Sequence, residues 1–323
     1  MNVSRSKETF TEEEMQELRD RLQAYKDEHG LTWQDLGAQV GVNKTTLSLF
    51  AINKYGADNR ELAWKVFRFF MAAEAAQQMA LQAPDVPSFI KTPTSEAMTR
   101  QLTWAHRGRM VVITGNPGVG KTATFKQYLE NTPNAVLVTA DKTTTGVTSL
   151  LLAMLTASGS LSRSGGRAYV LKMHLFDRLR TINPLIIVDE AQHLDDDAVE
   201  LLRSIHDELE CGLVLAGNQE VMRRVQRGAR TPAFAQVHSR VSWPQHYAAP
   251  TVGDINAILA AWDVTRPDEM EFMRAVAQSG GLRSITQTLE MATLAARASE
   301  EDRVLGHLKA TYEQRVAPLL KAA

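Results

Sequence analysis

The sequence predicts an α/β fold in which a parallel β-sheet domain is flanked by two all-α domains. Three observations support this prediction. Five short apolar runs alternate with helical segments between residues 99 and 250, which is the order of strands and crossover helices in a doubly wound sheet. The motif GNPGVGKT directly follows the first of these runs. Helical patterns alone occur before residue 83 and after residue 250.

The composition indicates a globular protein of several domains. A chain of 323 residues with 44% hydrophobic content can build two or three cores. Because the net charge is −1, contacts with nucleic acid must come from local basic patches. One cysteine excludes a disulfide within the chain, and neither a signal peptide nor an apolar run of ~18 residues is visible. We therefore expect a cytoplasmic protein without a membrane partner.

The first domain, residues 1–82, is predicted to be all helical. Thr11 and Glu14 form a capping-box pattern, in which each side chain bonds the backbone N–H of the other residue. Apolar residues then recur at helical spacing. The predicted helices cover residues 11–28, 32–40, 43–52 and 59–82.

The two short helices of this domain resemble a helix-turn-helix motif of the phage-repressor type, with Gly41 at the turn. Such motifs place the first residues of the second helix against DNA. The same fold also serves in protein–protein contacts, so DNA and protein both remain open as partners of this domain. The candidate DNA-contacting residues are Asn43, Lys44, Thr45 and Thr46.

A linker is predicted next, at residues 83–98, because Pro84, Pro87 and Pro93 fall within it. The sheet domain then covers residues 99–250. Its five expected strands are apolar without alternation, as in central strands that are covered on both faces. These strands are residues 110–114, 135–140, 185–190, 212–217 and 240–244. Residues 251–323 show only helical patterns and are expected to form a small C-terminal domain.

The motif GNPGVGKT has the full spacing of a P-loop, and it lies between a strand and a helix as that motif requires. Its glycines let backbone N–H groups surround phosphates, and the helix N-terminus adds partial positive charge. We expect Lys121 to reach the β- and γ-phosphates of ATP and Thr122 to ligate Mg²⁺. The predicted nucleotide-binding residues of this loop are Gly115, Asn116, Pro117, Gly118, Val119, Gly120, Lys121 and Thr122.

Acidic and amide side chains follow two later strands. Asp189 ends one strand, at the edge where α/β sheets bind ligands, and is expected to bind both the nucleotide and Mg²⁺. Glu190 is the candidate general base that polarises the attacking water. Asn218 ends the next strand and could orient that water, although Gly-Asn is also common in turns.

Basic residues outside the P-loop form candidate DNA-binding patches. One lies after the second strand, at Lys142, Thr143 and Thr144, and another at Arg163, Arg167 and Lys172. Basic and hydroxyl side chains suit contacts with DNA phosphates, which position a protein without reading sequence. Each patch could equally be a solvated helix face.

Nearly the whole chain resembles the Mu B-type AAA+ transposition ATPases, and more distantly the TniB- and TnsC-like transposition ATPases. The resemblance is carried by INKYGADN (52–59), GNPGVGKT, IIVDEAQHL (186–194), GLVLAGN (212–218), FAQVHSR (234–240) and GGLRSITQTLEMATLAA (280–296). It implies an arginine that reaches into a neighbouring subunit's ATP site, for which Arg240 is favoured over Arg224 and Arg230. It also implies that Arg283 contacts the γ-phosphate from the C-terminal domain.

The same resemblance implies a function. Such proteins bind ATP, polymerise as helical filaments on double-stranded DNA with little sequence preference, and present that DNA to a transposase, which they stimulate. Hydrolysis of ATP releases the DNA and produces target immunity. Three alternatives remain open: an ATP-gated scaffold without a DNA function, a replication-type loader, and a helix-turn-helix repressor with an accessory ATPase.

Overall fold

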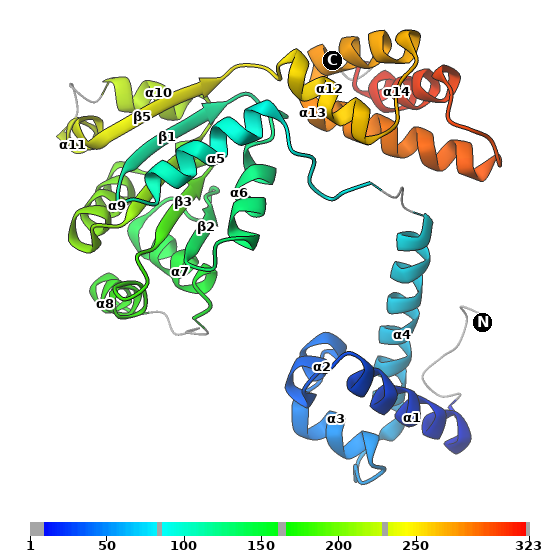
Figure 1. The fold of residues 1–323 in the computed structure, drawn as a ribbon. Helices are drawn as coiled ribbons and strands as arrows, with labels where there is room; N and C mark the ends of the chain where they lie inside the picture. Colours follow the sequence, from blue (N-terminus) through cyan, green and yellow to red (C-terminus); the bar gives the residue numbers. More distant parts are fainter. Residues whose placement is uncertain (1–9, 83–85, 161–165, 228–231, 321–323) are drawn as a thin grey trace. The chain divides into compact units, whose positions relative to one another are not determined.

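The computed structural model describes residues 10–82, 86–160, 166–227 and 232–320 (Figure 1). The chain forms two compact units, one at residues 1–83 and the other at residues 84–323. Each unit has its own buried core. The two units are described separately below.

The first unit is a four-helix domain whose helices agree with those expected from the sequence. They are α1 (Glu12–Glu28), α2 (Trp33–Val40), α3 (Lys44–Ala51) and α4 (Asn59–Gln82). Thr11 and Glu14 form the expected capping box, and Gly41 ends α2 in the left-handed conformation with φ of 75°. Fully buried Leu22, Leu36, Leu47, Phe50 and Val66 form its core.

In the second unit, regular structure begins earlier than the linker prediction of residues 83–98 allowed. Helix α5 (Pro93–Ala105) starts inside that segment. Thr92 caps it through the N–H of Ser95, and Pro93 fits the first helical turn because no intrahelical N–H is needed there. Met98 and Leu102 anchor the helix in the core of the sheet domain.

A five-stranded parallel sheet forms the centre of this unit (Figure 1). Its strands are β1 (Met110–Gly115), β2 (Ala135–Thr139), β3 (Leu185–Asp189), β4 (Gly212–Gly217) and β5 (Val241–Tyr247). They lie in the order β2-β3-β4-β1-β5, so β4 separates the P-loop strand from β3. The carboxyl ends of β1, β3 and β4 therefore meet at one edge of the sheet.

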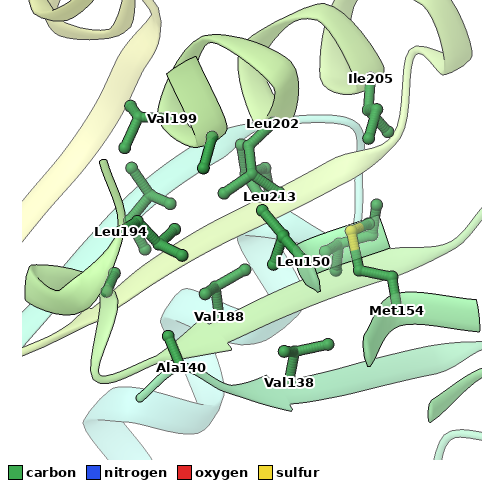
Figure 2. Close-up of a cluster of buried hydrophobic side chains, with 14 of the residues drawn as sticks. Val138, Ala140, Leu150, Met154, Val188, Leu194, Val199, Leu202, Ile205 and Leu213 are labelled. Carbon is green, nitrogen blue, oxygen red and sulfur yellow. The ribbon is translucent and has the colours of Figure 1, made fainter. Parts of the chain in front are cut away.

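Helices cover both faces of the sheet, as expected from its apolar strands. They are α6 (Lys121–Glu130), α7 (Val147–Ala157), α8 (Ala168–Leu179), α9 (Asp196–Leu209), α10 (Gln219–Gln226) and α11 (Pro232–Arg240). Figure 2 shows one of the two cores, in which Leu150 of α7 and Leu202 of α9 pack with Val188 and Leu213 of the strands. Cys211 is also buried there, and burial raises the pKa of its thiol to about 12.

The described C-terminal residues, 251–320, form an all-α domain that we call the lid. Its helices are α12 (Val252–Ala261), α13 (Pro267–Ala298) and α14 (Leu305–Leu320), and α13 is broken at Gly280 and Gly281. Buried Asp254 of α12 accepts hydrogen bonds from the backbone N–H and the hydroxyl of Thr94, at 2.7 and 2.6 Å. This contact ties the lid to the start of α5. None of the helices described is long and apolar enough to cross a membrane.

Candidate nucleotide and DNA sites

The P-loop joins β1 to α6 and is held by the end of β5. The N–H and the side-chain amide of Asn116 donate to the carbonyls of Tyr247 and Ala248, at 3.1 and 2.6 Å. Gly118 and Gly120 have φ of 85° and 96°, a region that favours glycine because a Cβ is crowded there. The eight residues predicted from the motif thus run from the end of β1 through one anchored loop into the first turn of α6.

Lys121 points back into this loop. Its Nζ donates to the carbonyl of Gly115 at 2.7 Å, and only 8% of the residue is exposed. Burial lowers the pKa of Lys121, although the charges of Asp189 and Glu190 oppose this effect. The charge of Arg283 lowers the same pKa further, so Arg283 of the lid lies within electrostatic reach of the P-loop lysine.

The structure brings the two predicted magnesium ligands together. The Thr122 hydroxyl donates to Asp189 Oδ2 at 2.6 Å, and Asp189 is 1% exposed. In the described ranges, no group of three or more His, Cys, Asp or Glu side chains could hold a metal. The oxygens of Thr122 and Asp189 fit Mg²⁺, which typically takes one or two protein oxygens together with substrate phosphates and water.

Glu190 is held in an unusual backbone conformation. Its φ is 55°, a left-handed value that costs a residue with a Cβ roughly 1–2 kcal/mol. Its N–H donates to Asp189 Oδ1 at 2.9 Å, and its carboxylate accepts a hydrogen bond from the side-chain amide of Gln192. The candidate general base is therefore fixed at both its backbone and its side chain.

Asn218 begins the helix that follows β4. Its side-chain oxygen accepts from the N–H of Glu220 at 2.8 Å and so caps α10. Its own backbone N–H donates to the side-chain oxygen of Gln192 at 3.2 Å. Asn218 is thus connected to Glu190 through Gln192, while its side-chain oxygen serves the turn.

The lid touches the P-loop through backbone atoms. The N–H of Leu282 donates to the carbonyl of Gly118 at 2.9 Å. A Cβ on Gly118 would lie 2.7 Å from the carbonyl oxygen of Gly280, and one on Gly281 would lie 2.9 Å from that of Gly118. The glycine break in α13 therefore allows a close approach, and exposed Arg283 follows it.

The candidate trans arginines make different contacts within their own chain. Arg240 donates from two nitrogens to the carboxylate of Asp207 on α9, at 2.7 and 2.8 Å. Arg224 donates to the carbonyl of Leu194 and to the carboxylate of Asp196, both at 2.8 Å. Arg230 lies outside the described residues.

The turn after β2 presents one exposed lysine, Lys142. The hydroxyls of Thr143 and Thr144 donate to the Asp141 carboxylate, at 2.6 and 2.8 Å. Together with backbone N–H groups, they lower the pKa of Asp141 to about 2. In this structure the two threonines therefore shape the turn that carries Lys142.

The second basic patch is only partly available. Arg167 is exposed at the start of α8, but Lys172 pairs with Glu208 and donates to the Ser204 hydroxyl at 3.0 Å. Arg163 lies outside the described residues. Tyr169 on the same helix is 72% exposed, and the sequence analysis did not single it out because an isolated tyrosine carries no motif.

The helix-turn-helix candidates lie at the start of α3. Asn43 caps this helix, because its side-chain oxygen accepts from the N–H of Thr46 at 2.8 Å. Lys44 and Thr45 are exposed, and Thr46 is half-buried. Three of the four candidates, Asn43, Lys44 and Thr45, are therefore exposed, although the side-chain oxygen of Asn43 is used by the cap.

Comparison with known proteins agrees with this geometry. A family model described as an AAA domain matches residues 103–225, and one described as "Mu B transposition protein, C terminal" matches residues 239–314. The "ATP-dependent target DNA activator B" proteins of Escherichia phages Mu and D108 are each 28% identical over 287 residues, covering 88% of this chain and 90% of theirs. The chain is a homologue of the Mu B transposition proteins.

A further relative of this Mu B homologue is the "Mu-like prophage FluMu DNA transposition protein B" of Haemophilus influenzae, which is 28% identical over 84% of this chain and 94% of that protein. Among solved structures, the ORC2 protein of Aeropyrum pernix matches with a TM-score of 0.54 and 20% identity over 71% of this chain and 70% of its own. The ORC1 protein of the same organism matches with a TM-score of 0.54 and 18% identity, over 75% and 71%. These likenesses show the fold, and the AAA domain match over residues 103–225 identifies it as that of the AAA+ ATPases.

Proposed function

We propose that this chain is an ATP-dependent, largely sequence-nonspecific DNA-binding ATPase that delivers target DNA to a transposase and activates it. The observation that carries the proposal is the direct Thr122–Asp189 contact beside the P-loop in a homologue of proteins named ATP-dependent target DNA activators. ATP with Mg²⁺ is the substrate, and double-stranded DNA, the transposase and further copies of the chain are the partners. Such a protein would work in the cytoplasm, where ATP and DNA meet.

The chain's own residues suggest how hydrolysis proceeds. Lys121 and the backbone N–H groups of the P-loop would bind the phosphates, and Thr122 and Asp189 would hold Mg²⁺, which would supply positive charge against the charge that develops. Glu190 accepts a proton from the attacking water. The water oxygen then forms a bond to the γ-phosphorus, and the bond between that phosphorus and the ADP oxygen breaks. Asn218 lies at the next strand end, where its amide can orient that water.

Assembly would depend on the arginines around this edge. We propose that Arg240 breaks its ion pair with Asp207 and contacts the ATP bound by the neighbouring subunit. Arg283 contacts the γ-phosphate of the ATP bound by its own subunit. Both contacts require the γ-phosphate, so ATP favours a helical filament and hydrolysis loosens it. This mechanism predicts slow intrinsic turnover that DNA and transposase stimulate, followed by release from DNA.

DNA binding would follow from repetition along such a filament. Lys142 and Arg167 offer weak phosphate contacts in each subunit, and a filament multiplies them without a strongly basic chain. The exposed residues Lys44 and Thr45 of the first unit offer an additional contact, with DNA or with protein.

The experiment that tests this function is electron microscopy of the protein on non-specific duplex DNA, with and without ATP. We expect filaments that require ATP, that are lost in Lys121→Ala, and that persist in Glu190→Gln because it binds ATP without hydrolysing it. Discrete particles without DNA in every nucleotide state would contradict the proposal and support an ATP-gated scaffold.

A further inference from the structure

Gln192 connects the ends of two strands through its side-chain amide. It lies on the short 3-10 helix η2 (Ala191–His193), directly after β3. The amide nitrogen donates to Glu190 Oε2, and the amide oxygen accepts from the backbone N–H of Asn218 at 3.2 Å. The candidate general base is therefore connected to the turn between β4 and α10.

The surroundings leave this amide little freedom. A Cβ on Gly217 would lie 2.2 Å from the Gln192 side-chain oxygen, so the amide occupies the space that a side chain at position 217 would need. Gly217 itself is buried. The amide is thus packed against the end of β4 as well as hydrogen bonded to it.

Arg224 of α10 holds the backbone that carries Gln192. Its guanidinium donates to the carbonyl of Leu194 and to Asp196, both at 2.8 Å, and lies 3.5 Å from the Gln192 carbonyl. Helix α10 therefore contacts the segment after β3 at two points, one through Asn218 and one through Arg224.

We propose that Gln192 is a positioning residue for ATP hydrolysis, which fixes Oε2 of Glu190 and leaves Oε1 to face the attacking water. This inference rests on the proposed ATPase function. A glutamate side chain rotates about three bonds, and each orientation lost on forming the reactive geometry raises the barrier. By holding one oxygen in advance, Gln192 removes part of that cost, and Arg224 keeps Gln192 in place.

The first test is steady-state ATP hydrolysis by the full chain with Mg²⁺ and duplex DNA. We expect Gln192→Ala to lower kcat about tenfold to a hundredfold, because small misplacements of a reacting group have effects of that size. KM should change less than about twofold, since the hydrogen bonds of Gln192 go to Glu190, Asn218 and Arg224 rather than to the P-loop, so the loss is confined to the reacting geometry.

The second test is the Gln192→Glu variant, which keeps the acceptor for the Asn218 N–H but replaces the donor to Glu190 Oε2. An ionised carboxylate cannot donate this hydrogen bond, and it repels the neighbouring carboxylate of Glu190. We therefore expect kcat to fall at least as far as in Gln192→Ala, with KM again changed less than about twofold.

Two controls make the outcome decisive. Gln226→Ala removes an exposed glutamine from α10 and should keep wild-type kcat. Glu190→Gln must abolish hydrolysis; if it does not, the proposed function is at fault. If Glu190→Gln is inactive while Gln192→Ala keeps wild-type kcat, the role of Gln192 is wrong. It is also wrong if Gln192→Glu folds and binds a fluorescent ATP analogue but keeps wild-type kcat.

Discussion

The candidate nucleotide edge of the second unit and the short helices α2 and α3 of the first differ in how their polar groups are held. Thr122 and Asp189 are bonded across 67 positions of the chain, and Gln192 reaches Asn218 across 26. In the first unit, the side chains of Thr32 and Asn43 bond N–H groups only three residues away. The nucleotide site therefore depends on the whole sheet, whereas each short helix secures its own beginning and leaves one face exposed.

The largest effect should come from breaking a long-range contact. Asp254→Ala leaves the buried N–H of Thr94 without its acceptor, and we expect unit 2 to lose about 2–4 kcal/mol of unfolding free energy. Urea denaturation measures this loss. Asp268→Ala, an exposed residue in the first turn of α13, is the control and should change stability little.

The same contact predicts a pH dependence. Burial would raise the pKa of Asp254, but hydrogen bonds from Thr94 and Thr251 outweigh it, so the pKa lies below the ordinary value of 3.8. A carboxyl group whose pKa is lowered by folding contributes its full stabilisation at pH values above its ordinary pKa. This contribution is lost as pH falls through the pKa that the group has in the folded protein. Acid titration of the Asp254→Ala variant should therefore show a weaker loss of stability below pH 3.8 than wild type.

Two glycines test the comparison directly, since both have positive φ. A Cβ on Gly118 would lie 2.7 Å from the carbonyl oxygen of Gly280 in the lid, whereas a Cβ on Gly41 would have no heavy atom within 4 Å. We expect Gly118→Ala to weaken ATP binding about tenfold or more, measured with a fluorescent ATP analogue. Gly41→Ala should cost unit 1 about 1 kcal/mol through backbone strain alone and leave ATP binding unchanged. Equal effects on ATP binding would show that the lid contact is unimportant.

A smaller effect is expected from removing a local cap. Asn43→Ala takes away the acceptor for the Thr46 N–H, and such a loss costs about 1 kcal/mol. Thermal unfolding of unit 1 should register it, while ATP hydrolysis without DNA stays at the wild-type rate. A change in that rate would mean that the first unit influences the nucleotide site.

The smallest effect concerns two lysines in different surroundings. Lys142 is exposed, whereas Lys172 is paired with Glu208. Lys142→Ala should reduce the salt dependence of DNA binding by about one phosphate contact, and Lys172→Ala should leave it unchanged. Fluorescence anisotropy at several salt concentrations measures both. A larger effect for Lys172→Ala would mean that its ion pair opens on DNA.

The sequence predicted more of the fold than of the contacts within the site. The alternation of strands and helices along the chain, with apolar runs that lack polar alternation, was sufficient to predict the parallel sheet. The spacing of the P-loop motif indicated which strand leads into the candidate phosphate-binding loop. Helix α5 was missed because three prolines dominated the pattern, although Pro93 occupies a position that favours helix initiation.

Gln192 shows why the remaining contacts could not be predicted. It was visible in the motif DEAQ, yet nothing in the sequence indicates that its amide crosses from β3 to the end of β4. The same holds for Arg240 with Asp207 and for Lys172 with Glu208, since each pair joins elements more than 30 positions apart. Spacing along the chain identifies reactive groups, whereas the partners that hold them depend on tertiary packing.

The buried thiol of Cys211 has a practical consequence. The thiolate is the nucleophile that attacks thiol-reactive dyes, and the raised pKa of Cys211, about 12, keeps this thiol protonated near neutral pH. Since the chain has one cysteine, a cysteine introduced at an exposed position, such as Gln287 of α13, would be the main site of labelling in an otherwise native protein. A single fluorophore on the lid could then report, in real time, whether the backbone contact between Gly118 and Leu282 opens when ATP is consumed.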